Sequence, residues 1–144
     1  PTLRLTRRQR QMCIRDRADL WLKFLLFNAV SSTTAGARTT MGVVRHTPEL
    51  WSLFADLVRE TDAVARALGV RLPEGAAERV IDVAAAMPAG ARASTAHDLE
   101  AGRALETDWL CGALARIGDE IGVPVPASRT VAALLAPYRN GTPA

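Results

Sequence analysis

The segment TPELWSLFADLVRETDAVARALG, residues 47–69, decides the fold class of this chain. Thr47 is a suitable N-cap, Pro48 fits the first helical position, and Glu49 complements the positive end of the helix dipole. Apolar residues then recur at spacings of three and four, which is typical of an amphipathic helix: Leu50, Leu53, Phe54, Leu57, Val58, Val64, Ala65 and Leu68. Gly69 supplies the left-handed residue that often ends a helix.

Similar signals predict helices on both sides of this segment. The expected helices cover residues 18–36, 74–86, 93–101 and 105–121, and a last one begins at a capping Ser128 and reaches about Leu135. Gly36 and Gly122 are expected helix ends, residues 39–42 a turn, and V-P-V-P at 123–126 an extended connector. No segment shows the alternation of a strand. We therefore predict an all-α domain, a bundle of about six helices.

Composition excludes several classes of protein. Hydrophobic residues make up 49% of the chain and aromatic residues 5%, which favours an aliphatic, ordered core. The two cysteines make neither a disulfide framework nor a C-x-x-C site, so we expect a reducing, cytoplasmic setting. The apolar run at 20–30 is about half a membrane span and contains Lys23 and Asn28, which argues against a membrane protein.

The positive charge is concentrated at the beginning of the chain. Residues 1–17 contain six arginines and one aspartate, whereas the rest of the chain is slightly acidic. Within them, QMCIRDR at 11–17 resembles the translation of a transposase adapter used in sequencing libraries. We interpret 1–17 as a disordered or artefactual basic arm, with a genuine basic arm as the alternative. We expect 18–137 to form the helical domain and 138–144 a frayed tail.

Lys23 is the only lysine in a chain with 17 arginines. It lies between Leu22 and Phe24 in the most apolar predicted helix, which we expect to be buried in the domain or at an interface. Burial prepares a lysine for proton transfer in enzymes, which makes Lys23 a candidate acid. The alternative is that its ammonium group simply reaches water from a half-buried helix.

Two motifs resemble the C-terminal domain of ketopantoate reductases (2-dehydropantoate 2-reductases). Trp21-Leu22-Lys23 is similar to the W-x-K segment that opens that domain, and residues 94–108 are similar to its S-x-x-x-D-x-x-x-G-R-x-x-E-x-D signature. The resemblance covers about 18–137 and implies the helical fold seen in 6-phosphogluconate-dehydrogenase-type reductases.

The resemblance also implies an activity. Enzymes of this family reduce a 2-keto acid to a 2-hydroxy acid with NADPH, which is held mainly by an N-terminal Rossmann domain. By resemblance, Lys23 is the general acid, Glu106 a catalytic cleft residue, and Ser94 and Asp98 substrate ligands. The resemblance further implies a homodimer. The chain contains no G-x-G-x-x-G and no P-loop, so we expect it to lack the cofactor domain and to be inactive alone.

The chain departs from the family pattern after the lysine. The family usually has Asn four and eight residues later, whereas this chain has Phe27 and Ser31, with Asn28 beside the first position. Asn28 and Ser31 remain candidate substrate ligands, although one residue turns a helix by about 100°. These changes suggest that the substrate is a 2-keto acid other than ketopantoate.

The other residues with reactive or aromatic side chains are expected in structural positions. His46 and His97 have no partners at metal spacing and are expected at the surface or as caps, while Cys111 is expected to be packed. Asp108 either orients Glu106 or starts a helix, and Trp51 and Trp109 belong to the core or an interface. The alternatives to a reductase domain are a non-catalytic dimerisation module and a nucleic-acid-binding regulator with a basic arm, the latter disfavoured by the acidic body.

Overall fold

The computed structural model describes residues 6–144, and this part contains seven α-helices, two short 3-10 turns and no strand. The all-α expectation is therefore confirmed. The elements are α1 (Arg7–Gly36), α2 (Met41–His46), α3 (Pro48–Ala67), α4 (Ala76–Ala85), α5 (Ser94–Glu100), η1 (Thr107–Trp109), α6 (Cys111–Ile121), α7 (Pro126–Leu135) and η2 (Ala136–Tyr138). None of these helices is long and apolar enough to cross a membrane.

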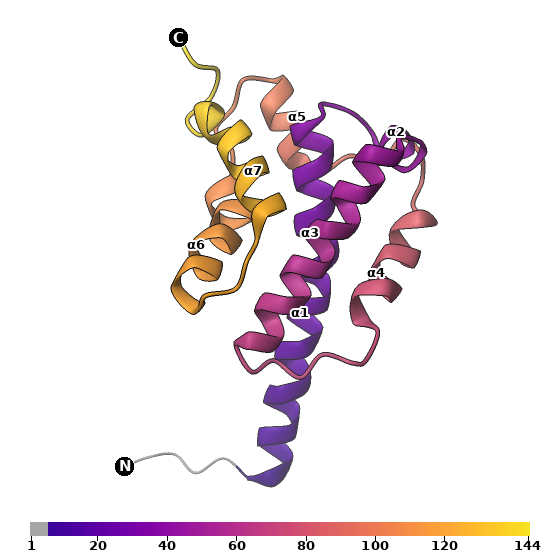
Figure 1. Cartoon of the computed structure of the whole chain (residues 1–144), viewed down its shortest axis with the longest axis vertical. Helices are drawn as coiled ribbons and strands as arrows, with labels where there is room; N and C mark the ends of the chain where they lie inside the picture. Colours follow the sequence, from indigo (N-terminus) through magenta and orange to yellow (C-terminus); the bar gives the residue numbers. More distant parts are fainter. Residues whose placement is uncertain (1–5) are drawn as a thin grey trace.

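Helices α1 and α3 lie side by side at the centre of the molecule, with α4 on one side and α6 and α7 on the other (Figure 1). The largest part of the core forms where α1, α3 and α4 meet. Leu25, Phe54 and Leu57 are fully buried there, and small residues such as Ala29 and Ala84 let the helices approach closely. The aliphatic core expected from the composition is thus present, and the bundle fixes the direction of α1.

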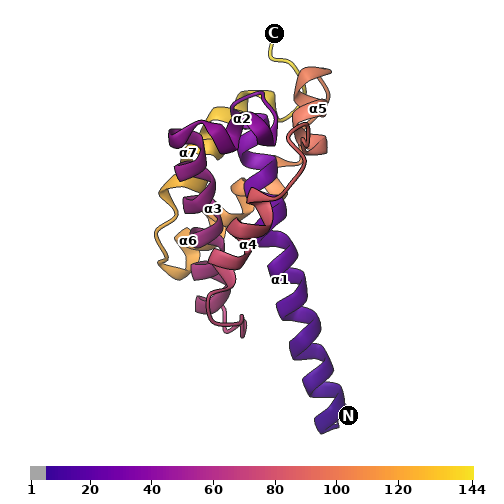
Figure 2. The same cartoon turned by 90° about the vertical axis from the view of Figure 1, so that its right-hand side faces the viewer.

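Helix α1 begins at Arg7 and not near residue 18, and its first turns extend beyond the other helices (Figure 2). Its start is a capping box: the Gln9 amide donates to the Thr6 hydroxyl at 3.2 Å, and the Thr6 amide donates to the Gln9 side chain at 2.9 Å. This helix start was not predicted because residues 7–17 are mostly polar and show no periodic spacing of apolar residues. The division into an arm and a domain stays a prediction.

Three other local expectations were wrong. The turn expected at 39–42 ends at Thr40, because residues 41–46 form α2, and α6 begins at Cys111 because residues 103–110 form a loop and the η1 turn. Ser128 lies in the first turn of α7 and does not cap it. The Glu60 carboxylate instead accepts hydrogen bonds from the Ala127 amide at 2.7 Å, the Ser128 amide at 2.9 Å and the Ser128 hydroxyl at 2.6 Å.

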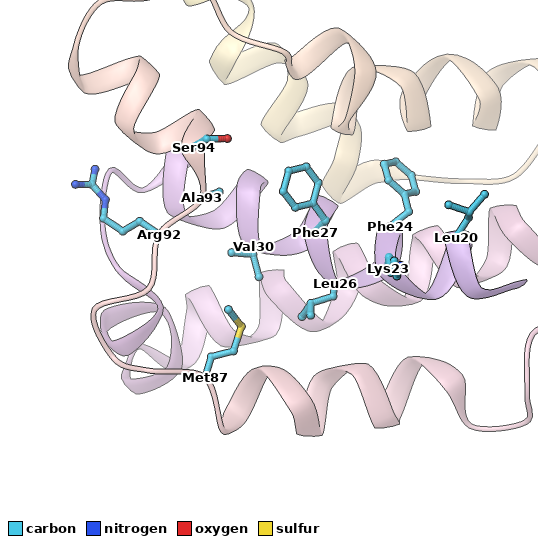
Figure 3. Close-up of a pocket in the computed structure, with 10 residues that line it drawn as sticks. All are labelled: Leu20, Lys23, Phe24, Leu26, Phe27, Val30, Met87, Arg92, Ala93 and Ser94. Carbon is cyan, nitrogen blue, oxygen red and sulfur yellow. The ribbon is translucent and has the colours of Figure 1, made fainter. Parts of the chain in front are cut away.

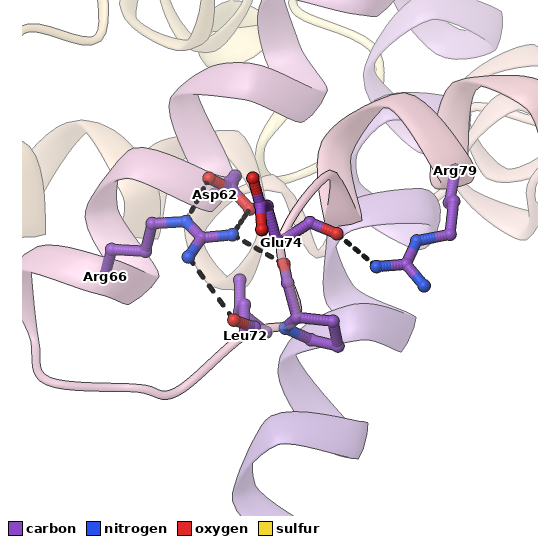
Figure 4. Close-up of polar contacts among 6 residues, drawn as sticks. Asp62, Arg66, Leu72, Glu74 and Arg79 are labelled. Carbon is purple, nitrogen blue, oxygen red and sulfur yellow. Dashed lines mark hydrogen bonds and ion pairs between the residues drawn. The ribbon is translucent and has the colours of Figure 1, made fainter.

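A group of arginine contacts holds the connection between α3 and α4 (Figure 4). Arg66 donates to the Asp62 carboxylate at 2.7 and 3.2 Å, to the Leu72 carbonyl at 3.3 Å and to the Pro73 carbonyl at 2.8 Å. Its hydrogen bond to Asp62 raises the pKa of Arg66. Arg79 donates to the Glu74 carbonyl from the first turns of α4. These bonds satisfy carbonyl groups that the turn leaves without helical partners.

The connection between α4 and α5 is held against α1 and α2. The Met41 and Gly42 amides donate to the carbonyls of Ala91 and Ala89 at 2.9 and 2.8 Å, and the Ala93 amide donates to the Thr34 hydroxyl at 3.3 Å. A Cβ atom on Gly42 would lie 2.8 Å from the Ala89 carbonyl oxygen, so only glycine permits this approach. Residues 87–94 are therefore placed beside the exposed face of α1.

Candidate functional site

A groove of about 650 Å³ runs along α1 and ends at the beginning of α5 (Figure 3). This volume lies within the range of small-molecule sites in proteins. Helix α1 supplies one wall, and the connection between α4 and α5 supplies the other. The groove is lined by Leu20, Lys23, Phe24, Leu26, Phe27, Val30, Met87, Arg92, Ala93 and Ser94.

The groove exists because one face of α1 has no helix packed against it along part of its length. Leu20, Lys23 and Phe27 follow one another at helical spacing on that face, whereas the half-buried Phe24 at its edge packs against the core cluster of Val64, Leu114 and Val125. Leu20 is 65% exposed and Phe27 is 48% exposed, although both are large apolar residues. The helix is therefore not buried on all sides in this chain, and its opposite face carries the core contacts of Leu25 and Ala29.

Lys23 and Ser94 line the same groove although they come from distant parts of the sequence. Lys23 is exposed on α1, and among the described residues no hydrogen bond or ion pair to its ammonium group is formed. Ser94 is the first residue of α5, and it is exposed as well. Of the six residues proposed for the site, these two are the ones that the fold brings together at the groove.

Arg92 also lines the groove, and sequence reasoning did not select it. Its side chain is only 16% exposed, and its Nη1 donates to the Glu100 carboxylate at 2.9 Å. Its Nε is buried and has no partner among the described atoms. Arginine is the usual cation of this chain, so the sequence offered no signal that would distinguish Arg92 from the others.

Asn28 and Ser31 lie beside the groove but do not line it. Asn28 is fully buried between α1 and α3: its Nδ2 donates to the Thr61 hydroxyl at 3.3 Å, and its Oδ1 accepts from the Ser32 hydroxyl at 3.4 Å. Ser31 is 1% exposed, and its hydroxyl has no hydrogen-bond partner among the described residues. The polar groups proposed as substrate ligands after the lysine are therefore inside the domain.

The two candidate carboxylates also lie away from the groove lining. Asp98 is half-buried on α5, four residues after Ser94, and accepts from Arg103 Nε at 2.8 Å. Glu106 is exposed and directly precedes η1. Asp108 does not orient Glu106 here, because its carboxylate pairs with Arg139 at 3.0 Å. Whether Asp98 and Glu106 act on a substrate stays a prediction.

The remaining candidates have structural environments. Cys111 is packed at 1% exposure, and burial raises the pKa of its thiol. His46 and His97 are exposed, and Nδ1 of His46 lies 2.7 Å from the Gly42 carbonyl oxygen. Trp51 stacks on Phe54 at the edge of the core, whereas Trp109 is 76% exposed. Within residues 6–144, no group of His, Cys, Asp and Glu could hold a metal ion.

Comparison with known families now identifies the domain. The family model described as "Ketopantoate reductase PanE/ApbA C terminal" matches residues 16–139. The chain belongs to this family. The W-x-K segment and the signature at 94–108, which suggested the relationship, both lie inside the matched range.

Curated relatives of this ketopantoate reductase domain are named 2-dehydropantoate 2-reductase. The 2-dehydropantoate 2-reductase of Pyrobaculum aerophilum is 33% identical over 77% of this chain and 39% of its own length. The 2-dehydropantoate 2-reductase of Caulobacter vibrioides is 33% identical over 81% of this chain and 40% of its own length. The chain thus spans about two fifths of the length of these relatives.

Solved structures give the same picture of the fold. A PanE/ApbA family ketopantoate reductase from Ralstonia eutropha aligns with a TM-score of 0.76 and 35% identity over 85% of this chain and 41% of that one. A dimeric ketopantoate reductase from Staphylococcus aureus aligns with a TM-score of 0.79 and 24% identity over 85% of this chain and 43% of that one. The helices described here therefore have the arrangement of a ketopantoate reductase C-terminal domain.

Proposed function

We propose that this chain is the substrate-binding and catalytic C-terminal domain of an NADP-dependent, 2-dehydropantoate 2-reductase-like oxidoreductase. The parent enzyme reduces a 2-keto acid to a 2-hydroxy acid, and a Rossmann domain outside this sequence holds the cofactor. The supporting observation is the groove of about 650 Å³ in which Lys23 and Ser94 lie together. Membership of the family supports the reaction class.

Lys23 acts as the general acid. Its ammonium group is exposed to the groove, so a keto oxygen bound there can receive a proton from Nζ. Bound NADPH supplies the hydride that the carbonyl carbon accepts. The negative charge that develops on the oxygen is stabilised by the positive field of the ammonium group, and proton transfer then removes it. Ser94 is the hydroxyl donor proposed for the substrate carboxylate; because that carboxylate is bonded directly to the keto carbon, Lys23 and Ser94 must approach each other in the closed enzyme.

The residues present do not provide a complete cofactor site. A dinucleotide needs backbone amides at a glycine-rich turn to hold its pyrophosphate, and the described residues contain no such turn. The groove offers an apolar wall and two cations, which suit a small anionic substrate. The NADPH phosphates would therefore be held by the other domain, and this domain would supply the side of the cleft that carries Lys23 and Ser94.

Glu106 and Asp98 belong to the proposal as residues that act in the closed cleft. Glu106 is free at the surface to reach a partner across the cleft, where it hydrogen-bonds and helps to set the state of Lys23. Asp98 requires release from Arg103 before it can bind substrate. Ser31 and Asn28 are the weakest members of the site, because both are buried in this domain. The parent enzyme is proposed to be cytoplasmic.

The test is Lys23→Ala in the intact two-domain enzyme. We expect turnover to fall by roughly 10²–10⁴-fold, the usual contribution of a positioned acid. The melting temperature should not change, since Lys23 makes no polar contact among the described residues. Arg71→Ala is the matched control, because Arg71 is an exposed cation outside the groove. Full turnover in Lys23→Ala would exclude the general-acid role.

A homodimer is part of the proposal, and a purely structural dimerisation module is the alternative function. The exposed apolar residues Leu20, Phe27 and Trp109 favour an interface of some kind. Sedimentation of the chain alone tests the interface, and turnover of the Lys23→Ala enzyme distinguishes the two functions. A dimer that Leu20→Glu dissociates, together with full turnover in Lys23→Ala, would favour the module over the enzyme domain.

A further inference from the structure

Glu106 lies at the end of an irregular connection, residues 101–106, that joins α5 to the η1 turn. Residues 103–106 belong to no helix, and the exposed Glu106 side chain forms no hydrogen bond or ion pair among the described residues. Connections of this kind move more than the elements that they join. A carboxylate that acts in a cleft needs a well-placed backbone, so the contacts that hold this connection from outside decide where Glu106 lies.

Arg139, directly after the η2 turn, contacts the chain on both sides of Glu106. Its carbonyl accepts a hydrogen bond at 3.1 Å from the amide of Leu105, the residue before Glu106. Its Nε lies 3.2 and 3.0 Å from the two carboxylate oxygens of Asp108 in η1. Asp108 does not bind the Glu106 carboxylate, but its ion pair anchors the turn that follows it. One residue, distant in the sequence, therefore holds both neighbouring parts of the backbone.

The chain beyond Arg139 lies against the beginning of the same connection (Figure 2). Gly141 is buried with a φ of 106°, and a Cβ atom on it would lie 2.8 Å from the Gly102 carbonyl oxygen. A Cβ atom on Gly102, with a φ of 68°, would lie 2.7 Å from the Thr142 hydroxyl oxygen. Glycine at both positions permits this close approach of the two backbones.

Apolar packing brings the two parts of the chain together without fixing Glu106. Leu105 is 7% exposed, and Tyr138 packs against the cluster to which Leu105 belongs. Such packing is not directional, so it places the end of the chain near the connection and leaves its exact position open. The hydrogen bond and the ion pair of Arg139 are directional, and they act on the residues next to Glu106.

We propose that Arg139 is a positioning residue for Glu106, acting through the backbone of the connection and the η1 turn and not on the substrate. This inference rests on the proposed role of Glu106 in the closed cleft. The side chains of Arg139 and Asp108 are 53% and 42% exposed, so their ion pair contributes little to the stability of the domain. Its effect is on geometry, where a displacement of about 1 Å can lower a rate by roughly 10²-fold.

The first measurement is amide hydrogen exchange in the 144-residue chain, followed by mass spectrometry. Arg139→Ala should increase exchange in residues 103–110 and leave the exchange of the other helices unchanged. Arg59→Ala is the matched control, because the 54% exposed side chain of Arg59 forms an ion pair with Glu78 at 3.1 Å. Unchanged exchange at 103–110 in Arg139→Ala would overturn the inference, whatever reaction the parent enzyme catalyses.

Kinetics of the intact two-domain enzyme test whether Arg139 acts through Glu106. With NADPH and either ketopantoate or 2-oxo-3-methylbutanoate, Arg139→Ala should lower kcat about tenfold, and Arg59→Ala should not lower it. Arg139→Lys should restore most of the loss, because a single nitrogen contacts both Asp108 oxygens and an ammonium group can replace it. In a Glu106→Gln background, Arg139→Ala should change kcat by less than about twofold, since the carboxylate through which it acts is gone.

The outcomes separate this inference from the proposed function. Losses that multiply in the double variant would show that Arg139 does not act through Glu106, and the reductase function would stand. Full turnover in Glu106→Gln would overturn the role of Glu106 and this inference together. Reduction of neither 2-keto acid by the unsubstituted enzyme would overturn the proposed function and, with it, the role of Arg139.

Discussion

On the face of α1 that meets α3, the buried Asn28 has partners at both ends of its amide, whereas on the groove face Lys23 has none among the described residues. Ser31, one turn after Phe27, is buried, and its hydroxyl has no partner among the described residues. The same helix thus pairs the Asn28 amide inside the domain and leaves the Lys23 ammonium group to solvent on the groove face.

The difference shows which side the fold uses for its own stability. Buried polar groups are normally paired, because an unpaired one costs about 1–3 kcal/mol. The Thr33, Thr34 and Thr61 hydroxyls follow this rule by donating to carbonyls one turn earlier on their own helices. Ser31 departs from this rule, whereas the exposed Lys23 falls outside it because its ammonium group is hydrated; a free cation on the groove face is consistent with a surface that is completed by another domain or a ligand.

The largest effect on stability is expected from Asn28→Ala. The change removes two buried hydrogen bonds and leaves a small cavity between α1 and α3, so the free energy of unfolding should fall by about 2–4 kcal/mol. Urea denaturation of the 144-residue chain measures it. Asn140→Ala, at an exposed position near the C-terminus, should change little. A loss equal to that of the control would mean that Asn28 does not hold α1 to α3.

A second test uses the partnered carboxylate that holds α7. Glu60→Ala removes three hydrogen bonds to the first turn of α7, and charge-assisted bonds of this kind contribute about 1.5–3 kcal/mol. Because Glu60 is only half-buried, we expect the free energy of unfolding to fall by about 2 kcal/mol. Glu120→Ala at an exposed position of α6 is the control. Equal midpoints for both variants would show that α7 does not depend on Glu60.

The helices were predictable where capping and helix-ending residues coincide with the periodic spacing of apolar residues. Thr47 is the N-cap of α3, Gly69 and Gly122 take positive φ angles of 79° and 73°, and α1 ends at Gly36. Helix α2 was missed because a helix of six residues is too short to show a periodic spacing of apolar residues. The role of Ser128 was missed because its partner, Glu60, is distant in the sequence, so only the tertiary structure reveals the contact.

The site was predictable only in part. Lys23 was selected as the single lysine and Ser94 by the family signature, and the fold brings both to one groove. Arg92 was missed because one arginine among 17 carries no signal. The direction of Asn28 depends on its angle around α1, and the angular argument from the helix repeat agrees with its position in the core.

The two cysteines provide a smaller test of burial. Cys13 is exposed on α1 and should react with a thiol reagent at pH 8 in the native chain, whereas the buried Cys111 should react only on unfolding. Burial raises the pKa of Cys111 above its ordinary value of 9.0. Its contribution to stability is therefore complete below pH 9.0 and is lost as the pH rises toward the native pKa, because the unfolded chain releases the proton first.

The measurement is the urea midpoint at pH 8 and pH 10 for the native chain and for Cys111→Ala. The decrease between the two pH values should be smaller in the variant, since the other titrating groups are common to both chains. Equal decreases, or a Cys111 that reacts as fast as Cys13 in the folded state, would contradict the packed position of this thiol.

The smallest effect is expected from Ser31→Ala, three residues from Asn28 on the same helix. The Ser31 hydroxyl already bears the cost of burial without a partner, so its removal should change the free energy of unfolding by no more than about 0.5 kcal/mol, or stabilise the chain slightly. Urea denaturation beside Asn28→Ala makes the comparison direct. A loss as large as that of Asn28→Ala would mean that Ser31 has a partner, for example an ordered water, and that both faces of α1 satisfy their polar groups. The contrast on which the groove is interpreted as a working surface would then rest on Lys23 alone.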